Sequence, residues 1–448
     1  MAPHVTNLAT ELVQHICMFL ETDSLHDFRL TCRTLLAQSL DVFTKRHFTC
    51  KKVMLEGTSL SMLLQITNNP VFCNQITTIY LDTSRLLTEA ETRSSRVNEP
   101  SWGHYDASRS RNVPREMLKA QGRLAVAQKE LLASGGTQKM LTEAFRRLRN
   151  LKTLAIIDGF SFVSLVSLGN ISRWKFVGME PEVQPGHLLS KDELFLILSA
   201  IKDSGISIRN LKIASGQHRS GCGGWASLSS AAMPLGADIV ELDETISALH
   251  SIGGSTYLAS VQHLHLSVWK SYIHRAAGED YSQKYRRALE HTLSHFPGLQ
   301  AFHLDMNRTI YDRSPSIFPA NYPSGLQTIR IERCILDDDA LLDTLMHSQA
   351  TLRSICLRHI RIKDWSKTLV KIRDSFALEY FEVGHVVQDH GGTGARAHMG
   401  SKMCFCERPE GQRECPRGIL HRASLARNVY SDLTKWAALV HFRDLPRP

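Results

Sequence analysis

Residues 326–357, LQTIRIERCILDDDALLDTLMHSQATLRSICL, contain the pattern that decides the fold. Two short triplets, Ile-Arg-Ile at 329–331 and Ile-Cys-Leu at 355–357, alternate as half-buried strands do. Between them Leu341 and Leu345 lie one helical turn apart, at the spacing of an amphipathic helix. Because strands joined by a helical crossover run in the same direction, the stretch predicts two parallel strands with a helix between them.

The same strand pattern recurs along the chain. Eight triplets share it: 79–81, 154–156, 211–213, 264–266, 302–304, 329–331, 355–357 and 381–383. The last four are 27, 26 and 26 residues apart, within the range of about 20 to 29 residues for leucine-rich repeats. We therefore predict an irregular α/β solenoid with a curved parallel sheet and helices on its outer face. It resembles a leucine-rich-repeat domain without the regular asparagine, and an ordinary α/β domain is the alternative.

Insertions interrupt the first half of the chain, where the triplets are 75, 57, 53 and 38 residues apart. We predict three insertions, near 83–140, 216–256 and 388–428. Residues 83–113 are polar and rich in turn-forming residues, which is typical of disorder. The segment after them predicts a helix that begins near Pro114 and ends before Gly135.

The N-terminal stretch 8–36, LATELVQHICMFLETDSLHDFRLTCRTLL, predicts a helix that is apolar around much of its circumference. Five apolar residues cover an arc of roughly 160°: Leu12, Val13, Ile16, Cys17 and Phe19. Packing on one side needs an apolar stripe of only about 100°. We therefore expect this helix to be covered from two sides.

Two further helices are predicted within the same segment. Ser24 and Asp27 resemble a capping box at the start of the second, and the third is predicted over 35–43. Three short helices in about 45 residues form too small a core to be reliably stable alone. The remaining apolar face must be covered by the rest of the chain or by another protein.

The residues of this segment resemble the F-box motif. The positions that carry the resemblance are Leu8, Glu11, Leu12, Ile16, Leu20, Asp23, Leu25, Leu30, Cys32 and Arg33. The run TKRHFTCKKVML at 44–55 resembles the form common in filamentous fungi, while Leu8-Ala9 replaces the usual Leu-Pro. The resemblance implies an adaptor-binding module at 1–50 and a substrate-recognition domain at 51–448. It also implies that the apolar residues Leu8, Leu12, Ile16, Leu20, Leu25 and Leu30 bind the Skp adaptor of a cullin-RING ubiquitin ligase.

A substrate surface is predicted on the sheet. Since side chains alternate along a strand, the central residues of the triplets lie on the concave face, away from the helices. We predict that His265, His303, Arg330 and Glu382 bind a protein substrate there, with His263 and Cys356 in the same polar row. The donors in this row suit an acidic or phosphorylated segment.

The resemblance implies a non-catalytic substrate receptor, because holding a substrate near a charged ubiquitin-transfer enzyme acts through proximity. Two alternatives remain open. One is an adaptor-bound scaffold that works outside the ligase. The other is a zinc- or cysteine-dependent enzyme that uses the C-terminal loop.

That loop, 388–428, contains the densest group of chemically reactive side chains. Its potential zinc ligands are His398, Cys404, Cys406, Cys415 and His421. Their C-x-C spacing differs from the C-x2–4-C spacing of structural zinc sites, so we predict no metal or cofactor. The chain has no nucleophile-elbow, P-loop, dinucleotide-binding or zinc-protease motif, so we predict no catalytic residue.

Composition narrows the class and the compartment. Hydrophobic residues at 43% and charged residues at 22% are those of a globular protein. No apolar run is long enough to span a membrane, and the N-terminus lacks the pattern of a secretory leader. The formal charge of +9 lies mostly in loop-like stretches without base-stacking or zinc-finger patterns, which disfavours nucleic acid as a partner. Ten dispersed cysteines favour the reducing cytoplasm or nucleus.

Overall fold

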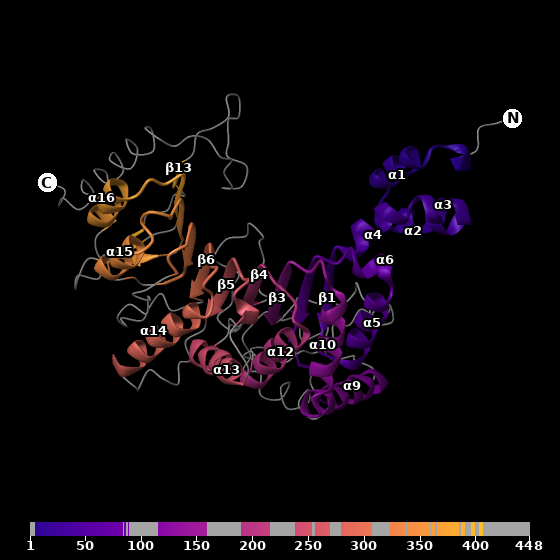
Figure 1. Cartoon of the computed structure of the whole chain (residues 1–448), viewed down its shortest axis with the longest axis horizontal. Coiled ribbons are helices and arrows are strands. Elements are labelled where there is room, and N and C mark those ends of the chain that lie inside the picture. Colours follow the sequence, from indigo (N-terminus) through magenta and orange to yellow (C-terminus); the bar gives the residue numbers. More distant parts are fainter. Residues whose placement is uncertain are drawn as a thin grey trace.

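A ten-stranded sheet in chain order dominates the computed structural model (Figure 1). The structure describes residues 5–83, 85, 86, 88, 115–158, 190–215, 238–252, 256–268, 279–306, 323–334, 336, 338–358, 360–362, 365–384, 387–389, 396–398 and 403–405. Nine parallel strands are β1 Cys50–Met54, β2 Thr78–Asp82, β3 Thr153–Asp158, β4 Asn210–Ser215, β5 His263–Val268, β6 Ala301–Met306, β7 Thr328–Glu332, β8 Ser354–Arg358 and β10 Tyr380–Gly384. The tenth, β13 Met403–Phe405, pairs antiparallel with β10.

Short strands β9 Arg361–Ile362, β11 Val387–Asp389 and β12 Arg396–His398 form a second, three-stranded sheet. All eight predicted triplets are strands of the main sheet. Each strand pairs with the one before it, and the order never reverses within the described part of the chain. A doubly wound α/β domain would reverse the order at a switch point, so the observed order is that of a solenoid-like repeat and not of a doubly wound domain.

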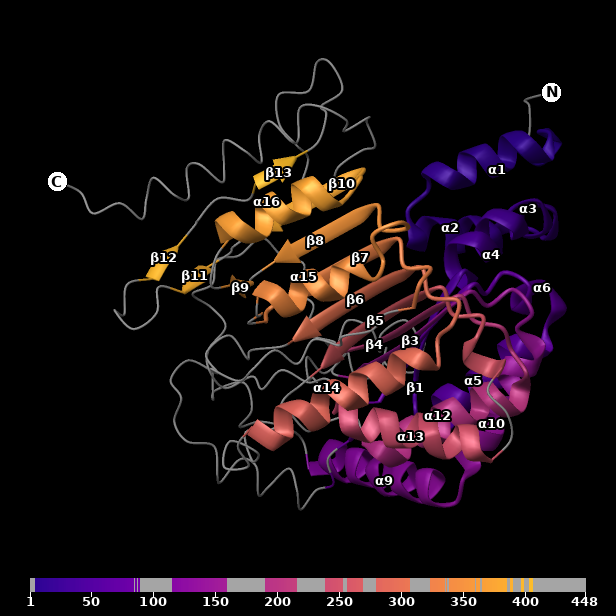
Figure 2. The same cartoon turned by 60° about the vertical axis from the view of Figure 1, so that its left-hand side comes forward.

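Helices cover one side of this curved sheet, as Figures 1 and 2 show from two directions. They are α5 Gly57–Asn68, α6 Pro70–Cys73, α9 Arg115–Ala133, α10 Gly136–Arg147, α12 Lys191–Ser204, α13 Ile239–Ser251, α14 Glu279–Ser294, α15 Asp338–Met346 and α16 Trp365–Ser375. The helix predicted after Pro114 is confirmed as α9. Gly135 follows it with φ of 69°, a left-handed conformation in which glycine has no steric penalty.

Helix α13 corrects the insertion predicted at 216–256. Its residues Ile239, Leu242, Ile246 and Leu249 are at most 2% exposed and belong to the main core. Their spacing of three and four residues places them on one helical face, against the sheet. Residues 239–251 are therefore a regular member of the helix layer, between α12 and α14.

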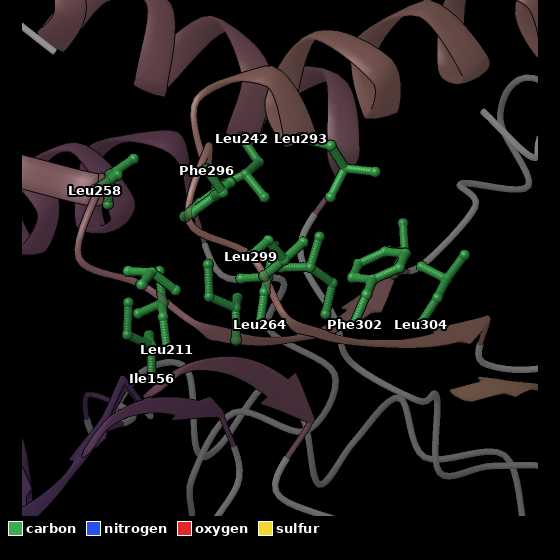
Figure 3. Close-up of a cluster of buried hydrophobic side chains, with 14 of the residues drawn as sticks. Ile156, Leu211, Leu242, Leu258, Leu264, Leu293, Phe296, Leu299, Phe302 and Leu304 are labelled. Carbon is green, nitrogen blue, oxygen red and sulfur yellow. The ribbon is translucent and has the colours of Figure 1, made fainter. Parts of the chain in front are cut away.

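The core lies between the sheet and the helices. One row of strand residues in neighbouring register forms its floor: Ile79, Leu154, Leu211, Leu264, Phe302, Ile329, Ile355 and Phe381. Each is at most 2% exposed. Figure 3 shows Leu264 and Phe302 of the strands packed beneath Leu242 and Leu293 of the helices. Full burial of one such side chain contributes about 1.5–3 kcal/mol, so the row is a main source of stability.

Strand β1 was missed because its inward position is a lysine. Lys51 pairs in register with Ile79, so it occupies the place of the first apolar residue of a triplet. Its ammonium lies 4.2 Å from the centre of the Phe48 ring, which in turn stacks on Phe72. A cation–π contact and a buried aliphatic stem therefore replace leucine packing at the end of the sheet.

The N-terminal segment forms four helices instead of the predicted three. They are α1 Thr10–Phe19, α2 Thr22–Thr31, α3 Arg33–Gln38 and α4 Leu40–Phe48, preceded by a short 3-10 turn at Val5–Asn7. The predicted third helix is divided at Ser39, whose buried hydroxyl donates to the Leu35 carbonyl at 2.5 Å. Serine hydroxyls that bond this carbonyl bend helices. Helix α2 begins two residues before Ser24, so the predicted capping box is wrong.

Some predicted features lie outside the described residues. Almost all of the polar stretch 83–113 does, and so does the zinc-ligand group, since no side chain of 388–428 is described. No helix in the described part of the chain is both long and apolar enough to cross a membrane.

Replacing Lys51 with leucine tests this account of β1. Burial lowers the pKa of the Lys51 ammonium, so the charged form costs folding free energy at neutral pH, a cost that fades as the pH rises toward the lysine range. Lys51→Leu is expected to raise the free energy of unfolding by about 1 kcal/mol at pH 7, after loss of the cation–π contact. Urea titration of the full chain measures this change. Lys52→Leu, one residue on and facing the other side of the sheet, is the matched control and should bring no gain; equal effects would contradict the assignment.

Candidate functional site

Exposed apolar side chains concentrate on the N-terminal helices. Seven large ones are found within the first 36 residues: Val5, Leu12, Ile16, Met18, Phe19, Leu30 and Leu36. The rest of the described chain exposes five: Val71, Leu124, Val126, Ile252 and Met346. A concentration of this kind marks an interaction surface, because scattered single residues are what a monomer ordinarily exposes.

Helix α1 has one covered side and one open side. Val13 and Cys17 are fully buried and pack in a small core with Leu25 and Leu35. On the neighbouring face Leu12 and Phe19 are 54% and 77% exposed, and Ile16 lies between them. The module therefore covers only part of the wide apolar arc of α1. We give the name apolar face to the six exposed apolar side chains of α1, α2 and α3, which are Leu12, Ile16, Met18, Phe19, Leu30 and Leu36.

The six predicted adaptor-binding residues fall into three groups. Leu12, Ile16 and Leu30 are exposed on the apolar face, and Leu30 is 82% exposed. Leu8 and Leu20 are half-buried against the small core. Leu25 is fully buried in that core, where it supports α1 from below. The predicted set omitted Met18 and Leu36, which are 55% and 42% exposed, and Phe19, which the helical arc already contained.

Arg46 of α4 fixes the direction of α1. Its guanidinium donates to the backbone carbonyls of Leu20, Met18 and Cys17 at 2.6, 2.8 and 3.2 Å. The last carbonyls of a helix lack partners within the helix and carry partial negative charge, so a cation satisfies both needs. Arg46 therefore holds the end of α1 against α4.

The module joins the sheet without a linker. Helix α4 ends at Phe48, and β1 begins two residues later at Cys50. The Thr49 carbonyl accepts both the Thr77 and Thr78 amide N–H groups at 3.0 Å, while Phe48 stacks on Phe72 with ring centres 4.2 Å apart. The orientation of the apolar face is therefore fixed relative to the first repeat.

The predicted substrate residues come together on the opposite face of the sheet from the helices. His265, His303, Arg330, Cys356 and Glu382 are successive partners across β5, β6, β7, β8 and β10. The rings of His265 and His303 stack with centres 3.8 Å apart and an interplanar angle of 20°. The structure thus places His265, His303, Arg330 and Glu382 in one row, as the alternation along the strands predicted.

Buried carboxylates accompany this row. Asp305, Glu332 and Glu382 are at most 5% exposed. Each accepts a hydrogen bond from an arginine Nε: Arg333 to Asp305 at 2.7 Å, Arg330 to Glu332 at 2.6 Å, and Arg358 to Glu382 at 2.7 Å. Burial alone would raise the pKa of Glu332, but Arg330, Arg333 and Arg358 together hold it below its usual value. The predicted donor Arg330 is therefore already engaged with a carboxylate of its own strand.

The buried thiols of Cys356 and Cys334 are poor nucleophiles. Burial first and Glu382 second raise the pKa of Cys356 to about 12, and burial raises that of Cys334 well above its ordinary value. Only a thiolate attacks readily, so these cysteines stay protonated and inert at neutral pH. A cysteine-dependent reaction gains no support from them.

Comparisons with known proteins leave the family open. No known protein family profile matches the chain, and no curated protein matches it in sequence. A solved structure from yeast, the complex of Rad7 and Elc1, is similar at 12% identity and a TM-score of 0.28. The match covers 85% of this chain and 80% of that one.

Replacing Arg46 tests how the apolar face is held. Arg46→Met keeps much of the aliphatic stem but removes three hydrogen bonds to the end of α1, so α1 should open more easily by about 1 kcal/mol. Amide hydrogen exchange of the full chain, followed at residues 13–19, measures the change. Arg33→Met, at an exposed position of α3, is the control and should leave this exchange unchanged. Unchanged protection in Arg46→Met would contradict the role assigned to Arg46.

Proposed function

We propose that this protein is the substrate receptor of a Skp-cullin-F-box ubiquitin ligase. The observation that carries the proposal is the apolar face, which lies on helices whose sequence resembles the F-box. The six exposed apolar side chains of this face include Leu12, Ile16 and Leu30 of the motif itself. The Skp adaptor would cover the open side of α1 that the chain leaves in solvent.

The energetics favour a protein partner for this face. Each large apolar side chain that becomes fully buried contributes about 1.5–3 kcal/mol before the costs of association are subtracted. Six large apolar side chains exposed on one small module are of the kind that forms the core of an interface. A small ligand would bind in a concave pocket, whereas these side chains project from the outside of helices.

The fixed join between module and sheet supports a receptor role. Since α4 passes directly into β1, a partner held on the apolar face and a substrate held on the sheet keep a constant separation. A ligase subunit of this kind acts by raising the effective concentration of the substrate near the charged enzyme. It contributes no catalytic residue of its own.

We place the substrate on the row of His265, His303 and Arg330. Glu382, the fourth residue predicted there, is buried and accepts a hydrogen bond from Arg358, so it supports the row and does not contact the substrate. The imidazoles are half-buried, and the Arg330 side chain retains 34% exposure while it pairs with Glu332. The exposed guanidinium N–H groups of Arg330 suit a carboxylate or phosphate of the substrate.

Because six described cysteines are free thiols, we assign the protein to a reducing compartment, the cytoplasm or nucleus.

Two other functions are separated from this one by simple measurements. A scaffold outside the ligase would bind the adaptor through the same face but would not co-purify with a cullin. An enzyme that uses the C-terminal loop would lose activity on Cys404→Ala without any loss of adaptor binding. Cullin co-purification from the native host therefore decides first between the proposed function and the scaffold.

The adaptor prediction concerns Leu12→Asp combined with Ile16→Asp. Burying an unpaired charge in an apolar interface costs several kcal/mol, so the Kd for the Skp adaptor should rise by about a hundredfold or more. Both side chains are exposed, at 54% and 38%, so the unliganded fold should be unaffected. Pull-down and calorimetric titration with the adaptor measure the effect.

The matched control for this variant is Leu124→Asp combined with Val126→Asp. These residues are exposed apolar side chains of α9, at 37% and 48%, far along the chain from the module. They should leave adaptor binding unchanged. Undiminished binding by the Leu12 and Ile16 variant would refute the adaptor surface.

The substrate prediction requires a variant that respects the ion pair of Arg330. Removing Arg330 alone would leave the carboxylate of Glu332 without this cation, and loss of one partner of a buried pair is strongly destabilising. Changing His265→Ala, His303→Ala, Arg330→Gln and Glu332→Gln together removes the row without that penalty. Substrate capture is expected to fall about tenfold or more, while adaptor binding and the melting temperature stay near wild type. Capture that persists here but disappears when 406–428 is deleted would place the substrate on the loop instead.

A further inference from the structure

A cluster of metal-ligating side chains lies on the outer helix layer, away from both surfaces described above. Asp243 comes from the middle of α13, His291 from the last turn of α14, and His295 from the turn that follows α14. Each offers one ligand atom, and these atoms all lie within 4.8 Å of one another. Helices α13 and α14 lie side by side in the layer (Figures 1 and 2).

The three groups are already oriented toward a common point. The Asp243 Oδ1 atom and the His291 Nδ1 atom are 2.8 Å apart, and the imidazole rings of His291 and His295 have centres 4.9 Å apart. The Thr292 hydroxyl lies 3.4 Å from the same carboxylate oxygen and Ser247 lies 3.4 Å from His291 Nδ1. The carboxylate is mostly shielded, with 19% of its side chain exposed, while the His291 side chain is 54% exposed. An ion could therefore enter from the His291 side.

One polar atom of the cluster has no partner. His295 Nε2 is buried and has no hydrogen-bond partner among the described residues. A buried polar nitrogen without a partner costs free energy, and a ligand that the coordinates do not contain is one reason for such an atom. His250 lies beside it, with ring centres 5.0 Å apart, which places a third imidazole at the edge of the cluster.

We propose that Asp243, His291 and His295 bind one late first-row divalent cation, zinc foremost, between α13 and α14. Imidazole nitrogens and a single carboxylate are the ligand set that zinc takes, whereas calcium and magnesium prefer oxygen ligands. Zinc binds nitrogen and oxygen at about 2.0–2.2 Å. Because the three ligand atoms already lie within 4.8 Å of one another, small side-chain rotations bring them around one ion. The ion takes the place of the hydrogen shared by His291 Nδ1 and Asp243 Oδ1, and the displaced proton passes to solvent.

The C-terminal end of α14 also attracts a cation to this site. His291 and His295 lie at the C-terminal end of α14, where the last carbonyls carry partial negative charge that favours a cation. Within the described chain, Asp243 forms an ion pair with His291 and with no lysine or arginine. The bound ion would link two adjacent helices of the outer layer and stabilise their packing.

The experiment uses the full chain, freed of metal by a chelator and then dialysed against zinc. Wild type is expected to bind one more equivalent of zinc than the double variant His291→Ala and His295→Ala, by metal analysis. In calorimetric titration His291→Ala, His295→Ala and Asp243→Asn should each weaken zinc binding by more than about tenfold. Removing a residue that only hydrogen-bonds a metal ligand already costs about tenfold in affinity, and removing the ligand itself costs more. Zinc should raise the melting temperature of wild type and not of the double variant, and magnesium should raise neither.

Two controls separate this site from others. His347→Ala removes an exposed histidine at the end of α15 and should leave zinc binding unchanged. Cys404→Ser with Cys406→Ser removes the thiols of the C-terminal loop and should likewise leave it unchanged, with a cobalt spectrum that lacks a thiolate band. Zinc content and thermal shift that are equal in wild type and the His291 and His295 variant would overturn the proposal. So would binding that is lost only in the cysteine variant.

Discussion

The hydrogen-bonded register between neighbouring parallel strands is the constraint on which the rest of the structure depends. It sets Ile79, Leu154 and their counterparts through Phe381 side by side, so the strands form one continuous apolar row. A row of that kind must be covered, and the helices of the crossovers cover it. Among the described residues, every crossover from β1 to β10 contributes at least one helix except the one between β6 and β7. Since the side chains alternate, the same register also gathers the polar residues His265, His303 and Arg330 on the other face. Core and candidate substrate surface therefore have a single cause, and a slip of one residue would exchange them.

The two ends of the array are treated differently. At the first strand the register places Lys51 where the other strands bury an apolar residue, and Phe48 of α4 covers it. Helix α4 thus belongs both to the end of the sheet and to the N-terminal module. The module's own core, built around Val13, Cys17, Leu25 and Leu35, is too small to cover the whole circumference of α1. Its open side is the consequence, and it is held in a fixed direction by the same helix that closes the sheet.

A feature could be predicted where neighbours in the sequence determine it, and could not where the packing of distant segments determines it. The eight triplets were found because two apolar residues flank each central one, and β1 was missed because Lys51 breaks that pattern. The break at Ser39 depends on a hydroxyl bond that helix periodicity does not show. Among the candidate sites, the exposure of Leu12 and Ile16 agreed with the wide arc, whereas the burial of Leu25 follows from how α1 and α3 pack around it. The Asp243 group escaped notice because its ligands are brought together only by the packing of α13 on α14.

The pairing of charges on the sheet limits how a substrate can be recognised there. Three guanidiniums, of Arg330, Arg333 and Arg358, face three buried carboxylates, so the charges of these three pairs cancel. A cancelled field steers an incoming chain weakly at distances beyond about 10 Å, the screening length of dilute salt. Discrimination must then come at contact, from the geometry of the guanidinium N–H groups and of the stacked imidazoles. Rigid support from the buried carboxylates favours this mode, because it fixes the donors before the substrate arrives and so lowers the entropy lost on binding.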